Sequence, residues 1–219
     1  MIGRLSWFGA MAALAGIVML AQLDRSARFA PQLAPLVPQA FSGFAAEERT
    51  RLAIAARDED RALAEAKALV RSRPVAGEHL AQLAVAAALA GEPELSASAL
   101  EAASVRGWRE PLSQFAAARI AIAAGAPDIA AQRIVALLST GQLPEETAAL
   151  FAAHIRTPEG REAMARRYAA FGRWQVNSLS PLASASDAND FAATIALALE
   201  LGAELPCDRV KRLTAIACS

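Results

Sequence analysis

Apolar stretches broken by Gly and Pro turns run along most of the chain, and their lengths are those of helices rather than strands. The pattern predicts paired helices from residue 43 onward, each pair joined by a short turn. Glu94 and Asp128 fall in first turns, where an acidic side chain complements the helix dipole. The predicted ranges are 43–56, 58–72, 77–90, 94–105, 111–124, 128–138, 145–154 and 158–171, followed by 190–201 and 208–217.

One apolar segment is different, because it carries no charge from Leu5 to Leu23. These 19 residues would span about 28 Å as a helix, close to the thickness of the hydrocarbon core of a bilayer. They predict a single membrane span. A cleaved signal peptide is the alternative, although Met19 stands where a cleavage site needs a small residue. A buried helix of a soluble protein is a third interpretation.

The remaining organisation follows from Pro, Ser and Asn. Pro31, Pro35 and Pro38 predict a semi-rigid, extended spacer over 24–42, which would hold the next domain away from the membrane. Ser, Asn and Asp around Pro181 predict a loop over 172–189. The expected domains are therefore 1–23 (anchor), 24–42 (spacer), 43–171 (helical repeats) and 172–219 (loop and capping helices).

An internal repeat supports the helix pairs. The segment from Ala90 to Leu95, A-G-E-P-E-L, returns 34 residues later from Ala124 to Ile129 as A-G-A-P-D-I. In the same register Ala84 coincides with Ala118, so small side chains repeat where helices would cross. Pro74, Pro111 and Pro144 mark the ends of successive units.

With this pitch, these small residues and the closing Pro74, the chain resembles the tetratricopeptide repeat family, although the family's early Trp and its Tyr are absent. The resemblance implies an all-α fold, a right-handed α-solenoid, in which the last helices cap the stack. Another α-helical array is the alternative. The family also implies a partner-binding groove on the first helix of each pair. Its register places there Phe44, Glu47, Arg51, Ile54, Glu78, Val85, Leu112, Phe115, Arg119 and Ile122.

Composition agrees with helices. Our count of 57 alanines in 219 residues favours helix over strand. The 22 basic residues balance the 22 acidic ones, which argues against nucleic acid as a partner. Arg outnumbers Lys by 20 to 2, a usage typical of GC-rich bacterial genomes.

No catalytic or metal-binding motif stands out in the sequence. His79 and His154 are 75 positions apart, outside any metal-ligand spacing, and both are expected to be structural. Cys207 and Cys218 would be about 16 Å apart on an unbroken helix, so a disulfide needs a chain that folds back, and two unpaired thiols are the alternative. We expect neither a catalytic residue nor a cofactor.

These observations predict a non-enzymatic, membrane-anchored scaffold that binds a partner protein in the bacterial cell envelope. The expected place is the inner membrane, crossed once, with the repeat domain in the periplasm. An accessory subunit of a larger membrane complex is the alternative, and an envelope enzyme with an unrecognised site is a third class.

Overall fold

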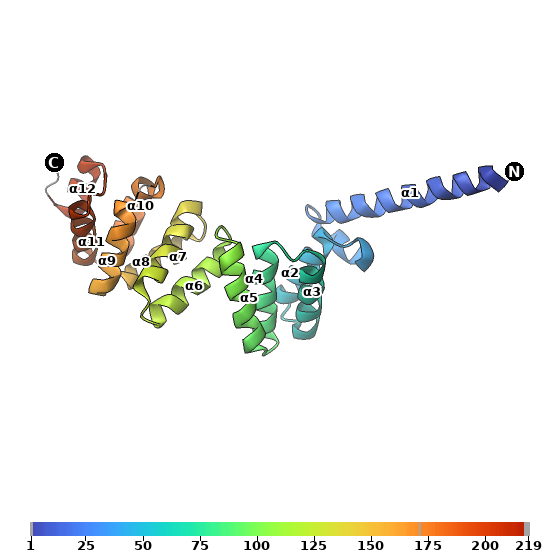
Figure 1. Cartoon of the computed structure of the whole chain (residues 1–219), viewed down its shortest axis with the longest axis horizontal. Coiled ribbons are helices and arrows are strands. Elements are labelled where there is room, and N and C mark those ends of the chain that lie inside the picture. Colours follow the sequence, from blue (N-terminus) through green and yellow to red (C-terminus); the bar gives the residue numbers. More distant parts are fainter. Residues whose placement is uncertain (1, 171, 217–219) are drawn as a thin grey trace. The chain divides into compact units, whose positions relative to one another are not determined.

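The computed structural model describes residues 2–170 and 172–216, and every regular element among them is helical (Figure 1). The chain divides into two compact units between Arg106 and Gly107, a boundary that falls inside the predicted repeat segment. Each unit is therefore described by itself.

The first unit joins one long helix to two helix pairs. The long helix α1 covers Ile2–Ala27, and two short 3-10 helices follow it, η1 over Pro31–Leu36 and η2 over Gln39–Phe41. The pairs are α2 (Phe44–Ala55) with α3 (Glu59–Ser72), and α4 (Gly77–Leu89) with α5 (Pro93–Arg106). Helix α4 also packs against α2 and α3, and alanines supply most of the buried side chains between them. Their small side chains let the helix axes approach closely.

The second unit contains α6 (Pro111–Ala123), α7 (Pro127–Thr140), α8 (Pro144–His154), α9 (Pro158–Ala169), α10 (Trp174–Ala185), α11 (Ala188–Glu200) and α12 (Cys207–Thr214). Helix α8 contacts α6 and α10, while α9 contacts α7 and α11, so alternate helices form two layers. Helix α12 packs on α10 and α11 and buries Val210. The last helices thus cover the end of the stack.

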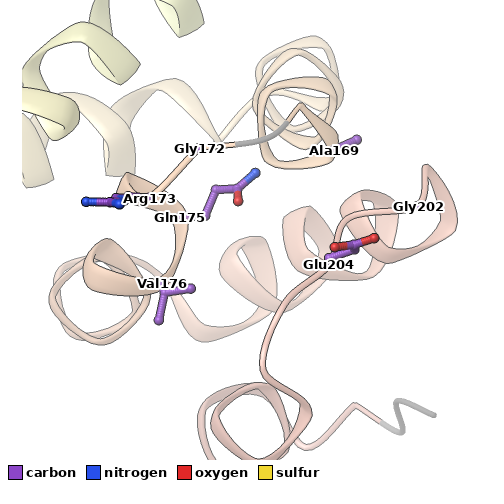
Figure 2. Close-up of a pocket in the computed structure, with 7 residues that line it drawn as sticks. All are labelled: Ala169, Gly172, Arg173, Gln175, Val176, Gly202 and Glu204. Atoms are coloured by element: carbon purple, nitrogen blue, oxygen red, sulfur yellow. The ribbon is translucent and has the colours of Figure 1, made fainter.

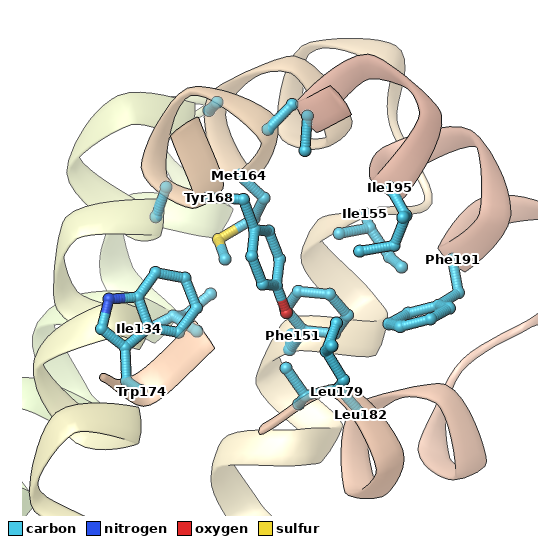
Figure 3. Close-up of a cluster of buried hydrophobic side chains, with 14 of the residues drawn as sticks. Ile134, Phe151, Ile155, Met164, Tyr168, Trp174, Leu179, Leu182, Phe191 and Ile195 are labelled. Carbon is cyan, nitrogen blue, oxygen red and sulfur yellow. The ribbon is translucent and has the colours of Figure 1, made fainter. Parts of the chain in front are cut away.

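Large side chains fill the space between these layers (Figure 3). Phe151 of α8 meets Phe191 of α11 edge to face, with ring centroids 6.3 Å apart. The ring centroid of Tyr168 on α9 lies 4.8 Å from that of Trp174 at the start of α10. The aromatic rings make this core different from the alanine-rich core of the first unit.

Two turns reproduce the 34-residue repeat in three dimensions. Gly91 and Gly125 both adopt left-handed backbone conformations, with φ of 71° and 65°. The residue after each glycine donates its N–H to a carbonyl five positions back, Glu92 to Ala87 at 2.8 Å and Ala126 to Ala121 at 2.9 Å. These bonds satisfy helix-end carbonyls in a Schellman motif. A proline then opens the next helix in each case.

The helices predicted between 43 and 171 agree with α2 to α9 to within two residues at every described end. Two other predictions are wrong. The loop expected over 172–189 contains α10, in which Pro181 occupies an exposed interior position while Trp174, Leu179 and Leu182 are buried. The spacer over 24–42 is not extended, since α1 continues to Ala27 and the prolines sit in η1 and beside η2.

Candidate functional site

The groove predicted from the repeat register is divided between the two units. Phe44, Glu47, Arg51 and Ile54 lie along one stripe of α2. Arg51 is exposed, yet its guanidinium already donates to Glu47 at 2.9 Å and to Glu48 at 2.6 Å. Two carboxylates therefore neutralise the arginine that was expected to hold a ligand. Phe44 already makes cation–π contacts within the chain, because the centre of its ring lies 5.0 Å from the guanidinium carbon of Arg73 and 5.6 Å from that of Arg28.

On α4 the predicted groove residues Glu78 and Val85 are exposed. His79, next to Glu78, is buried and connects α4 to α2. The Nε2 atom of His79 lies 3.7 Å from Oε2 of Glu47, while Nδ1 lies 3.1 Å from the carbonyl oxygen of Arg73. The Glu47 carboxylate raises the pKa of His79 above its ordinary value, and the imidazole in turn lowers the pKa of Glu47. Because both ring nitrogens face acceptor oxygens, the doubly protonated imidazolium fits this position best.

The other predicted groove residues lie on α6 in the second unit. Leu112 and Arg119 are exposed, and Phe115 and Ile122 are half-buried. The guanidinium carbon of Arg119 lies 5.9 Å from the centre of the Phe115 ring. Among the described residues no carboxylate pairs with Arg119, which distinguishes it from Arg51 two helix pairs earlier.

Sequence reasoning missed the segment that joins α1 to the helix pairs. We call residues 24–42 the collar. Asp24, in the last turn of α1, accepts hydrogen bonds from the backbone N–H groups of Gly43, Phe44 and Ala45 at 3.0, 3.2 and 2.9 Å. Its carboxylate thus caps the first turn of α2 across 19 to 21 residues of sequence. An N-cap residue is ordinarily sought beside its helix, so no local pattern could have found this one.

A buried arginine fixes the collar to the first helix pair. Arg49 of α2 is 5% exposed. It donates to the carbonyl oxygens of Ala34 and Val37 at 3.0 and 3.2 Å, and its Nε lies 3.1 Å from each oxygen of Glu65 on α3. The guanidinium also donates to Ser42 Oγ at 2.5 Å. One side chain therefore ties together the collar, α2 and α3.

A hollow of about 360 Å³ opens in the second unit (Figure 2). Arg173 and Glu204 lie on opposite sides of it, and Gln175 lies between them (Figure 2). The amide of Gln175 is already used, because its Nε2 donates to the carbonyl oxygens of Tyr168, in the last turn of α9, and of Ala170, directly after that helix. The described lining residues include no nucleophile and no imidazole, so this hollow offers little for catalysis.

A second hollow of about 370 Å³ lies where the turn before α7 meets the turn before α9. Ile122, from the predicted groove, and His154 both line it. His154 is buried, its Nε2 has no hydrogen-bond partner in the described part of the chain, and burial lowers its pKa. A neutral imidazole is therefore favoured here, in contrast to His79.

No group of three or more His, Cys, Asp or Glu side chains among the described residues is placed to hold a metal ion. Cys207 opens α12, whereas Cys218 lies outside the described residues, so a bond between them stays a prediction.

Comparison of the chain with protein-family models, curated proteins and solved structures finds no match. Consecutive helix pairs packed side by side make this a helical-repeat-like protein.

Proposed function

We propose that the protein is a non-enzymatic, membrane-anchored scaffold that binds a partner protein on its helical pairs. The observation that carries the proposal is the exposure of the long apolar helix α1. The apolar part of α1 is long enough to cross a membrane, and no residue of its most apolar window is buried against the rest of the chain. Large apolar side chains on this helix, among them Trp7, Phe8 and Met19, are exposed. A bilayer would cover them, as the chain itself does not.

The setting we propose is the bacterial inner membrane, crossed once, with the helix pairs in the periplasm. We also propose that the pairs are tetratricopeptide-like, on the basis of the 34-residue pitch and the two matching turns at Gly91 and Gly125.

The binding surface we favour is the exposed face of α6. Arg119 offers a guanidinium without a carboxylate partner among the described residues, and Leu112 offers an exposed apolar side chain two turns earlier. Seven residues of helix separate them by about 10 Å. A partner segment with a carboxylate and an apolar side chain at that separation fits this face, since arginine binds carboxylates through paired N–H donors.

The test uses the full chain in its membrane, with a photo-crosslinking residue in place of Leu112. We expect one partner to be crosslinked, the yield to fall with Arg119→Ala, and the yield to persist with Arg156→Ala, which removes an exposed arginine from the turn between α8 and α9. The same probe at Ile129, exposed on α7, serves as the position control. Equal yields from both positions, or no response to Arg119→Ala, would contradict the proposed surface.

An accessory subunit of a larger membrane complex is the second candidate. Gly9 with Ala13, and Ala12 with Gly16, place small residues four apart on α1, a spacing that suits close packing of membrane helices. An added Cβ at Gly9 or Gly16 would meet no heavy atom within 4 Å from outside the helix backbone. A probe at Met11 distinguishes the two functions. Crosslinks from Met11 and none from Leu112 would favour the accessory subunit over the scaffold.

A further inference from the structure

The apolar stretch and the first helix pair are joined without a free linker. The uncharged residues end at Leu23, and the next residue, Asp24, caps α2 through three backbone N–H groups at 2.9 to 3.2 Å. Leu23 itself packs against the small apolar cluster formed by Ala27, Ala34 and Val37 of the collar together with Ala45 of α2. The collar therefore lies beside the end of the apolar stretch (Figure 1).

The collar has a buried side and an exposed side. Ala34 and Val37 face inward, and Arg49 holds their carbonyl groups in place. Phe29 and Leu36 face away from the protein and are 81% and 64% exposed. Exposed apolar side chains of this size, on a segment held in place by hydrogen bonds, indicate a surface that another molecule covers.

The charges beside these residues are positive. Arg25 and Arg28 are both exposed, and the guanidinium carbon of Arg28 lies 5.8 Å from the centre of the Phe29 ring. Asp24 is the single acidic residue between 24 and 42, and its two oxygens are taken up by the N–H groups of α2. The exposed side of the collar thus combines apolar groups with uncompensated arginines.

We propose that the collar is a membrane-docking surface, with Phe29 and Leu36 in the interfacial layer and Arg25 and Arg28 on anionic phospholipid headgroups. The proposal rests on the membrane anchoring proposed above, because α1 delivers the collar to that depth. Aromatic side chains favour the bilayer interface, and basic residues near an anionic surface are attracted to it. Docking would fix the orientation of the first helix pair relative to the membrane.

The test uses the full chain reconstituted in vesicles of phosphatidylcholine with phosphatidylglycerol, a fraction of the lipids carrying bromine on their acyl chains. A Leu36→Trp variant reports on the collar. Val75→Trp is the control, since Val75 lies in the turn between α3 and α4 and is 81% exposed, against 64% for Leu36. We expect the emission of Leu36→Trp, after subtraction of the parent protein, to shift to shorter wavelength and to be quenched, while that of Val75→Trp is not.

Lipid charge supplies the second arm. Replacing phosphatidylglycerol by phosphatidylcholine, or introducing Arg25→Gln with Arg28→Gln, should reduce the quenching, with about a fivefold loss in the ratio of docked to undocked collar for each arginine. Arg71→Gln, which removes an exposed arginine from α3, should leave the quenching unchanged.

The two proposals fail differently. Quenching of the native Trp7 with none at position 36 would overturn collar docking and leave the anchor intact. Absence of quenching at both positions would overturn the anchor and the docking surface together. Quenching at position 36 that is insensitive to lipid charge and to both arginine substitutions would overturn the role of anionic headgroups.

Discussion

Arg57 occupies the same backbone position as Gly91, 34 residues later in the chain. Their φ angles are 54° and 71°, and each is followed by a residue whose N–H bonds to the carbonyl five positions back, Asp58 to Ala53 at 3.0 Å and Glu92 to Ala87 at 2.8 Å. The turn between α2 and α3 is therefore the same Schellman motif with arginine where later turns use glycine. A residue with a Cβ is strained in this conformation.

We expect Arg57→Gly to stabilise the first unit by about 0.5 to 1 kcal/mol, because relief of the left-handed strain exceeds the added entropy of the unfolded chain. Gly91→Ala should destabilise it by about 1 kcal/mol through the backbone alone, since no heavy atom lies within 4 Å of the added Cβ. Denaturant midpoints measure both changes. Arg57→Ala keeps the strain and should be nearly neutral, so a gain from that variant equal to the gain from glycine would contradict the explanation.

The same turns explain why the sequence predicts α2 to α9 well. Gly91 and Gly125 with the prolines that follow set the helix boundaries locally, and local signals are visible in a sequence. Helix α10 was missed because its Ser, Asn and Pro residues favour turns, whereas burial of Trp174 and Leu179 against the core decides its conformation. Tertiary packing overrode local preference there.

The candidate site was predictable only in outline. Repeat register placed Arg51 and Arg119 at equivalent positions, yet it could not show that Glu48 lies within 2.6 Å of Arg51 while no described carboxylate pairs with Arg119. The collar depends on Asp24 and Arg49, whose partners are far along the chain or are backbone carbonyls. Such contacts leave no periodic trace in a sequence.

The two histidines should give the two units opposite responses to pH. The raised pKa of His79 means that its pairing with Glu47 stabilises the first unit below pH 6.5 and is lost as the pH rises through that pKa. The lowered pKa of Glu47 sets the other limit, because the carboxylate contribution present above pH 4.5 disappears as the pH falls through the lowered value. The lowered pKa of His154 means that the second unit loses stability as the pH falls below 6.5.

Amide hydrogen exchange, corrected for its intrinsic pH dependence, can follow α4 and α8 separately between pH 8 and pH 6. On acidification we expect stronger protection in α4 and weaker protection in α8, each by at most about 1.4 kcal/mol per pH unit. His79→Asn should remove the first response and His154→Gln the second. Parallel changes in both helices, or responses that survive these variants, would contradict the assignment.

The aromatic core of the second unit should be its most sensitive point. Phe151 is fully buried and meets Phe191 edge to face, so Phe151→Ala creates a cavity and should cost about 3 to 5 kcal/mol of unfolding free energy. Phe151→Leu keeps most of the apolar volume and should cost less. Denaturation followed by tryptophan fluorescence, to which Trp174 of this core contributes, measures both. A similar small cost for both variants would show that the layers can close around the cavity.

The collar should be part of the folded domain rather than a spacer, and truncation tests this directly. A chain that begins at Asp24 keeps the carboxylate cap on α2 and the carbonyl groups of Ala34 and Val37 that receive Arg49. A chain that begins at Gly43 leaves the N–H groups of α2 without their cap and Arg49 without three of its acceptors. Loss of a cap costs about 1 kcal/mol, and removing the partners of a buried charge costs about 3 kcal/mol or more.

We therefore expect the chain that begins at Gly43 to unfold at a clearly lower denaturant concentration than the chain that begins at Asp24, with α2 and α3 the first helices to lose exchange protection. In the full chain, Asp24→Ala should reproduce the cap component alone, whereas Arg71→Ala, on the exposed side of α3, should change little. Equal stability of the two truncated chains would mean that the collar contributes nothing to the fold, and the rigid connection between the membrane helix and the helix pairs would have to be abandoned.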